Sequence, residues 1–130
     1  MSDQKLSTKE LILVVDDEPM VLRVCRRILE REGYEVLLAN DCEQAFAYLR
    51  EDEGGEVSLL VCDIRMPEMQ GDELAGELLE LQPDLEVIFI SGHAKEDAVN
   101  GFRKKARAKF LPKPFSADEL LEAVATALAS

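Results

Sequence analysis

The chain has 130 residues, 47% of them hydrophobic, which suits one compact domain with a sizeable core. Its formal net charge of −12 disfavours direct binding to nucleic acid or to an anionic membrane, because both are negatively charged. No apolar run is long enough to span a membrane, and residues 1–10 form a polar N-terminal lead without the apolar stretch of a secretory signal. We therefore expect a cytoplasmic protein.

Three cysteines are present, and none lies in a CxxC pair. Each falls inside a segment that is expected to form a helix or a strand, which favours small buried hydrophobes over metal ligands. An odd number of cysteines also fits a reducing compartment. The three residues are Cys25, Cys42 and Cys62.

Five short apolar runs predict β-strands. Several are rich in β-branched residues and continuously apolar, a pattern typical of strands buried on both faces of a parallel sheet. The runs cover residues 11–15, 36–39, 57–62, 87–90 and, more weakly, 109–111.

Amphipathic segments alternate with these runs and predict helices. Proline is suited to a first helical turn and glycine to a helix end, while a serine followed three residues later by glutamate predicts a capping box. The expected helices run from Pro19 to Gly33, from Asn40 or Asp41 through Leu49, from Leu74 to near Pro83, from Ala98 to Phe102, and from the capping box of Ser116 and Glu119 through Leu128.

Strict alternation of strands and helices predicts an α/β fold with a single doubly wound, five-stranded parallel sheet. Its crossovers should be right-handed, with helices on both faces. The pattern does not determine the strand order. The order 2-1-3-4-5 is common for five such units, and we adopt it as the expectation.

Polar residues follow four of the five predicted strands. Open sheets of this kind bind ligands beyond the carboxyl ends of their strands, so these side chains should meet at one edge. They are Asp16 and Asp17 after the first strand, Asp63 after the third, Ser91 after the fourth and Lys113 after the fifth.

Each of these residue types has a use in phosphoryl transfer. Clustered carboxylates suit Mg²⁺, with Mn²⁺ as an alternative, and a carboxylate such as Asp63 can attack phosphorus. Lys113 and Ser91 can hold phosphate oxygens through charge and a hydrogen bond. The set predicts transfer of a phosphoryl group to Asp63.

Each segment also has a simpler interpretation. Residues 16–19 could cap a helix, residues 63–67 could be an ordinary loop, and Lys113 could be a solvated lysine in a turn. The phosphoryl site is favoured because four separate strand ends supply the required residue types together.

The sequence resembles the receiver domains of two-component response regulators. The residues that carry the resemblance are 12–19 (ILVVDDEP), 60–71 (LVCDIRMPEMQG), 87–94 (VIFISGHA) and 110–115 (FLPKPF). It covers almost the whole chain and implies a CheY-like receiver domain over residues 11–130. Ser91 stands where threonine is commoner, and residues 106–108 depart from the usual Gly-Ala, so the turn before the last strand could differ.

The resemblance implies a role for each residue of the metal site. Asp63 would be the phosphoacceptor and would also ligate Mg²⁺. Asp17 would ligate the ion directly, Asp16 would act mainly through water, and the backbone carbonyl of Arg65 would complete the protein ligands.

The resemblance also implies how the phosphoryl group is held and sensed. Ser91 and Lys113 would bind its oxygens, with a cis peptide between Lys113 and Pro114. On phosphorylation Ser91 would move towards the group and Phe110 would turn inward. The alternative for Phe110 is a permanently buried core residue.

In similar proteins the switch alters a surface formed by the fourth helix, the fifth strand and the last helix. Here this region has a basic cluster, followed by an acidic last helix, and it could be a docking or dimerisation face or a solvated face of mixed charge. The residues are Arg103, Lys104, Lys105, Arg107 and Lys109, then Asp118, Glu119 and Glu122.

The same resemblance implies the binding partners and the residues that set the lifetime of the phosphoryl group. A sensor histidine kinase or phosphotransfer domain would supply the phosphoryl group, and an unknown downstream protein, or a second copy in a phosphorylation-dependent homodimer, would receive the signal. Arg65 and His93 would flank the attacking water and tune autodephosphorylation.

The chain would thus be a phosphoacceptor switch and not an enzyme acting on other substrates. One rival is an aspartyl-phosphate phosphohydrolase, but many of these have a second aspartate where Arg65 stands. The other is a binding module that never accepts phosphate, which the intact set of site residues disfavours.

Overall fold

The computed structural model describes residues 10–50, 57–63, 71–91 and 109–129. These residues form one sheet of five parallel strands in the order β2-β1-β3-β4-β5, which confirms the expected fold and strand order. The strands are β1 (Leu11–Val15), β2 (Glu35–Ala39), β3 (Leu59–Asp63), β4 (Glu86–Ser91) and β5 (Lys109–Pro112).

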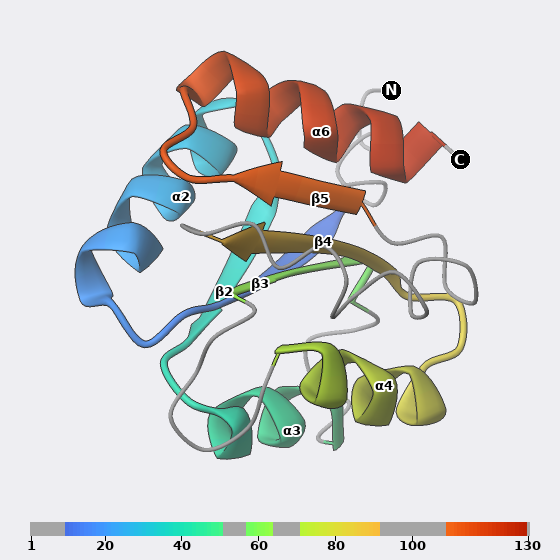
Figure 1. The fold of residues 1–130 in the computed structure, drawn as a ribbon. Coiled ribbons are helices and arrows are strands. Elements are labelled where there is room, and N and C mark those ends of the chain that lie inside the picture. The colour runs from blue at the N-terminus through green and yellow to red at the C-terminus, as the bar shows by residue number, and fades with distance from the viewer. Residues whose placement is uncertain (1–9, 51–56, 64–70, 92–108, 130) are drawn as a thin grey trace.

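Within the described part of the chain, four helices cover the sheet in two layers. In Figure 1, α2 and α6 lie on one face of the sheet and α3 and α4 on the other. The short helix expected at residues 98–102 lies outside the described residues. The described helices are α2 (Pro19–Arg31), α3 (Cys42–Arg50), α4 (Gly71–Leu81) and α6 (Ala117–Ala129).

Side chains of the central strands alternate between two apolar layers, because successive residues of a strand point to opposite faces. In β1, Leu11, Leu13 and Val15 face the α3–α4 layer, whereas Ile12 and Val14 face the α2–α6 layer. All five are buried, so β1 is covered on both sides, as its continuous apolar sequence predicts.

Local signals set the helix ends. Pro19 begins α2, and Gly33, with a φ of 103°, follows its end in the left-handed region that glycine tolerates. Asp41 caps α3 by accepting a hydrogen bond from the Gln44 amide at 2.8 Å.

The capping box expected before α6 is present. The Ser116 hydroxyl accepts from the Glu119 amide at 3.1 Å, and the Glu119 carboxylate accepts from the Ser116 amide at 2.9 Å. Two amides at the helix start, which have no partner within the helix, are thereby satisfied.

The third strand begins later than the sequence suggests. We expected it at Val57, but β3 starts at Leu59. Val57 is buried and bound on both backbone groups by the side-chain amide of Gln82, which follows α4. The Val57 amide donates to the Gln82 oxygen at 3.2 Å, and the Gln82 amide donates to the Val57 carbonyl.

Cys25, Cys42 and Cys62 are all buried, as predicted. Burial raises the pKa of Cys25 to about 12, and the nearby Asp16 carboxylate adds to the effect. Within the described part of the chain, no helix combines the length and apolar character needed to cross a bilayer.

Candidate functional site

Three carboxylates meet where β1 and β3 end. The two strands are neighbours, with Val15 in register with Cys62, so the residues that follow, Asp16 and Asp63, come side by side. Asp17 adds a third group, and one carboxylate oxygen from each residue lies within 4.8 Å of the others. Asp16 and Asp63 are buried and Asp17 is exposed, so the cluster opens towards solvent on one side.

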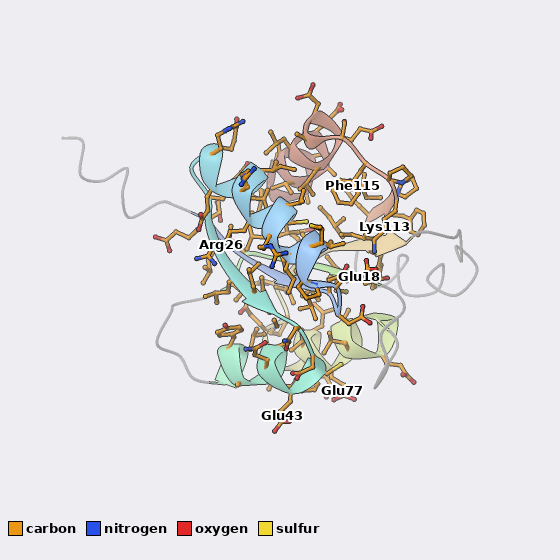
Figure 2. The ribbon with its side chains drawn as sticks, turned by 90° about the vertical axis from the view of Figure 1, so that its left-hand side faces the viewer. Glu18, Arg26, Glu43, Glu77, Lys113 and Phe115 are labelled. Carbon is orange, nitrogen blue, oxygen red and sulfur yellow. The ribbon has the colours of Figure 1, made fainter. Side chains whose placement is uncertain are left out.

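Lys113 extends into this cluster from the segment that follows β5. Its Nζ lies 3.1 Å from Asp63 Oδ2, 3.5 Å from Asp16 Oδ2 and 3.7 Å from Glu18 Oε1. The Lys113–Pro114 peptide bond is cis. Figure 2 looks onto this edge of the sheet and shows Lys113 next to Glu18.

Burial makes the Asp16 carboxylate expensive to ionise. Desolvation raises the pKa of Asp16 from 3.8 to about 6, with smaller increases from the negative charges of Asp63 and Asp17. The hydrogen bond from the Glu18 amide and the positive charge of Lys113 lower the pKa, but they do not offset burial. The folded protein therefore holds a poorly solvated negative charge at neutral pH.

The opposite balance holds at Lys113. Burial lowers its pKa, but the nearby carboxylates, with Asp16 the largest contributor, raise it more, so the net shift is upward. Lys113 is therefore an ammonium ion at neutral pH. Among the described residues, one ammonium beside three aspartates leaves an excess of negative charge at this edge.

The donor set fits a hard divalent cation. Mg²⁺ prefers carboxylate oxygens and retains several waters, and this cluster provides two buried carboxylates and one exposed one. Charge in the buried pair is only partly compensated by Lys113, so a cation would relieve the repulsion between carboxylates. Asp16, Asp17 and Asp63 are the residues that would hold it.

The simpler interpretation of residues 16–19 as a helix cap accounts for one hydrogen bond of Asp16. Asp16 Oδ1 accepts from the Glu18 amide at 2.9 Å, just before α2. Its other oxygen, Oδ2, faces Lys113 instead. Asp16 therefore has two roles: one oxygen stabilises the start of α2, and the other belongs to the acidic cluster.

Other predicted site residues are described less fully. Ser91 ends β4 opposite Pro112 of β5, but its side chain lies outside the described part. Phe110 is half-buried and packs against the α3–α4 layer, opposite Phe89 of β4. Arg65, His93 and residues 103–107 lie outside the described residues.

An apolar groove beside Lys113 was not anticipated from the sequence. It has a volume of about 480 Å³, and two of its residues, Met20 and Val24 on α2, are 65% and 45% exposed. The spacing of apolar residues in the α2 sequence predicts which side of the helix is buried. It does not show that the exposed side near the groove is also apolar. The groove is lined by Met20, Val21, Val24, Lys113, Pro114 and Phe115.

Arginines extend the exposed side of α2 beyond this groove. Arg23, Arg27 and Arg31 are exposed, and Arg26 pairs with Glu30 at 3.2 Å on the same helix (labelled Arg26 in Figure 2). The surface of α2 is thus apolar near Lys113 and basic farther along, in a chain with a formal net charge of −12.

Comparison with known sequences gives a consistent result. The sequence pattern described as "Response regulator receiver domain" matches residues 12–125. The chain is 38% identical over 117 residues to the response regulator receiver protein CpdR of Brucella abortus, covering 89% of this chain and 93% of CpdR. It is 39% identical over 119 residues to the sensor kinase CckA of the same organism, covering 92% of this chain but 12% of the kinase.

Solved structures show the same architecture. A response regulator receiver domain protein from Clostridium thermocellum superimposes with a TM-score of 0.84 at 28% sequence identity, over 92% of this chain and 94% of that one. The chain thus matches most of the length of CpdR but only a small part of CckA.

Proposed function

The chain belongs to the response regulator receiver family of two-component phosphorelay systems, and on that premise we propose that it accepts a phosphoryl group on Asp63. The observation that carries the proposal is the ion pair of 3.1 Å between Asp63 and Lys113 inside a cluster of three carboxylates. A nucleophile, a cation for the phosphoryl charge and ligands for a metal thus share one edge of the sheet.

In the proposed reaction an oxygen of Asp63 attacks phosphorus, and the bond from phosphorus to the donor breaks. The donor leaves with the electron pair, either as the imidazole of a histidine kinase or phosphotransfer domain or as the carboxylate of a small acyl phosphate. Lys113 balances charge on the phosphoryl oxygens, and Ser91 donates a hydrogen bond to one of them. A bound Mg²⁺, or Mn²⁺ in its place, would supply positive charge that offsets the negative charge of the carboxylates and the phosphoryl oxygens.

In this proposal Asp17 and Asp63 would hold the metal directly, and Asp16 would act mainly through water. The backbone carbonyl of Arg65 would complete the protein ligands. Burial of Asp16 supports this assignment, because a carboxylate with a raised pKa gains more from a nearby cation than a solvated one does.

Intact mass separates this proposal from its rivals. The protein is incubated with Mg²⁺ and acetyl phosphate, beside the Asp63→Asn variant. A single added phosphate that is absent in the variant and disappears slowly supports the switch. Rapid turnover of the donor would instead indicate a phosphohydrolase, and no adduct would indicate a binding module.

The donor protein is proposed to dock over the groove beside Lys113. A donor must approach Asp63 closely, and Lys113 both lines the groove and contacts Asp63. Exposed Met20 and Val24 offer apolar contact there, and the arginines of α2 favour acidic residues on the partner.

This docking is tested with a purified histidine kinase that phosphorylates the wild-type chain. Val24→Ser should slow phosphotransfer from the kinase and leave phosphorylation by acetyl phosphate unchanged, because the small donor needs no docking surface. Leu81→Ser is the matched control, since Leu81 is 50% exposed on α4, in the opposite helix layer. Equal slowing by both variants would exclude docking at the groove.

The output is proposed to be a change at the surface that includes β5 and α6. Phe110, which is half-buried, would turn inward as Ser91 engages the phosphoryl group. The basic residues 103–105 would contact the downstream protein or a second copy, so reversing all three to glutamate should weaken that binding. Unchanged affinity would exclude this face.

The lifetime of the phosphoryl group is proposed to depend on Arg65 and His93. Substituting either should change the rate of autodephosphorylation more than the extent of phosphorylation. This is measured by following loss of the adduct after the donor is removed, and unchanged rates in both variants would contradict the assignment.

A further inference from the structure

Glu18 is an acidic residue at the site to which the reaction described above gives no role. Its Oε1 lies 3.7 Å from Lys113 Nζ, and the side chain is 63% exposed. Glu18 does not belong to the cluster of Asp16, Asp17 and Asp63 whose oxygens lie within 4.8 Å of one another. Its side chain is also far more exposed than those of Asp16 and Asp63.

The backbone of Glu18 is held on both sides. Its amide donates to Asp16 Oδ1 at 2.9 Å, and its carbonyl accepts from the amides of Val21 at 3.1 Å and Leu22 at 3.2 Å. The residue occupies the N-cap position of α2, yet its side chain makes no capping hydrogen bond. The carboxylate is therefore free of the helix start and lies near Lys113 instead.

Lys113 and a bound cation would compete for the same oxygens. The ammonium lies 3.1 Å from Asp63 Oδ2 and 3.5 Å from Asp16 Oδ2, and both residues belong to the acidic cluster. Two positive groups at such separations repel strongly in a partly buried site. Lys113 would therefore be driven away from part of this cluster by a divalent cation bound there.

We propose that Glu18 is a positioning residue that receives the Lys113 ammonium when the aspartate cluster holds a divalent cation. This rests on the proposed Mg²⁺-dependent function. Among the described residues that form ion pairs with Lys113, Glu18 alone lies outside the cluster. The Lys113 side chain is 21% exposed and flexible in its stem, so a short movement towards Glu18 keeps it at the site.

This arrangement also prepares Asp63 for attack. Lys113 Nζ donates a hydrogen bond to Asp63 Oδ2, which occupies a lone pair of the nucleophile. Movement towards Glu18 releases that oxygen and leaves the ammonium close enough to meet the incoming phosphoryl oxygens. Glu18 would thus act through Lys113, without touching the reacting atoms.

Calorimetric titration with MgCl₂ at fixed ionic strength tests the proposal. Glu18→Gln should weaken Mg²⁺ binding about fivefold, in the range of coupling between neighbouring charged groups. Glu18→Asp keeps the charge but shortens the side chain, so it should weaken binding nearly as much. If Glu18 acts only as a distant charge, Glu18→Asp will bind like the wild type, and the proposal fails.

A second arm removes the residue through which Glu18 acts. In a Lys113→Met background, Glu18→Gln should change Mg²⁺ affinity by less than about twofold, because no ammonium remains to be received. An undiminished effect in that background overturns the proposal. Circular dichroism verifies that each variant is folded, and the Glu18→Asp arm stands without the Lys113 variant.

The matched control is Glu77→Gln, which removes the same charge from an exposed position on α4. Figure 2 shows Glu77 on the opposite helix layer, away from Glu18 and Lys113. Its Mg²⁺ affinity should equal that of the wild type. Absence of Mg²⁺ binding in the wild type would contradict the proposed function itself, whereas wild-type binding with an unaffected Glu18→Gln variant would contradict only the role of Glu18.

Discussion

Replacing Asp16 by asparagine should stabilise the metal-free protein near neutral pH while removing a proposed metal ligand. The side chain of Asp16 is fully buried, and its pKa is raised from 3.8 to about 6, mainly by desolvation. Asparagine has nearly the same shape and no charge. The variant therefore avoids the energy of holding a carboxylate out of water.

The size of the effect follows from the pKa. A rise of roughly two units corresponds to about 3 kcal/mol between the protonated and ionised forms. This value already includes the favourable charge of Lys113, because that interaction contributes to the pKa of Asp16. For a domain of this size, about 3 kcal/mol corresponds to roughly 10 °C in melting temperature.

The pH dependence has a definite sign. The folded protein binds the Asp16 proton more tightly than the unfolded chain, so the stability linked to this proton is fully present below pH 3.8. It is lost as pH rises through about 6. Asp16→Asn should therefore exceed the wild type in unfolding free energy at pH 7.5, and the difference should become small near pH 4.

Urea unfolding in the presence of a metal chelator, at pH 7.5 and pH 4, measures this difference. Asp17→Asn is the matched control, because it removes a carboxylate from the same cluster but from an exposed position. It should change stability little. Our account of Asp16 would be refuted by an Asp16→Asn variant no more stable than the wild type at pH 7.5, or by an advantage that is equal at both pH values.

Three further changes test the framework around the site. Gln82→Ala should lower the unfolding free energy by about 1–3 kcal/mol, because it leaves the buried backbone groups of Val57 without this partner. Gln82→Glu, which keeps only the acceptor, should have a stability between those of the wild type and Gln82→Ala. A wild-type urea midpoint in Gln82→Ala would contradict the assigned hydrogen bonds. Ser116→Ala should lower the unfolding free energy by about 1 kcal/mol, because it removes the capping hydrogen bond at the start of α6. Ser116→Thr should retain most of the wild-type stability. Equal thermal stability of the wild type and both variants would argue against the cap. Cys25 should resist a thiol reagent at pH 8 until the protein is unfolded in urea, because the thiol is buried and burial raises its pKa to about 12. The modified cysteine is identified by peptide mass, and rapid modification of Cys25 in the native protein would contradict its burial.

The sequence was a good guide wherever a local pattern determines the structure. The unbroken apolar run of residues 11–15 forms β1 with the expected bounds, because only a strand covered on both faces buries every side chain. The capping box at Ser116 and Glu119 is also present, since its bonds join residues three apart. Clustering of Asp16 and Asp63 followed from placing their strands as neighbours.

Contacts between distant residues could not be predicted in the same way. Val57 resembles the first residue of a strand, but its backbone binds the side chain of Gln82, twenty-five positions later. Glu18 looked like part of a helix cap, and only the folded chain brings it to Lys113. The groove also needs the fold, because it joins Met20 and Val24 of α2 to Phe115 before α6.

The order of the strands means that the Lys113 side chain must reach across β4 to contact Asp63. β4 separates β3, which ends in Asp63, from β5, which precedes Lys113, so these two strands lie about two strand spacings apart, roughly 10 Å. The Lys113 side chain nevertheless comes within 3.1 Å of Asp63. β5 is an outer strand of the described sheet and forms a hydrogen-bonded ladder with β4 alone. A change of charge at Asp63 would therefore act, through Lys113, on an edge strand that lies two strands away and is held by one neighbour only.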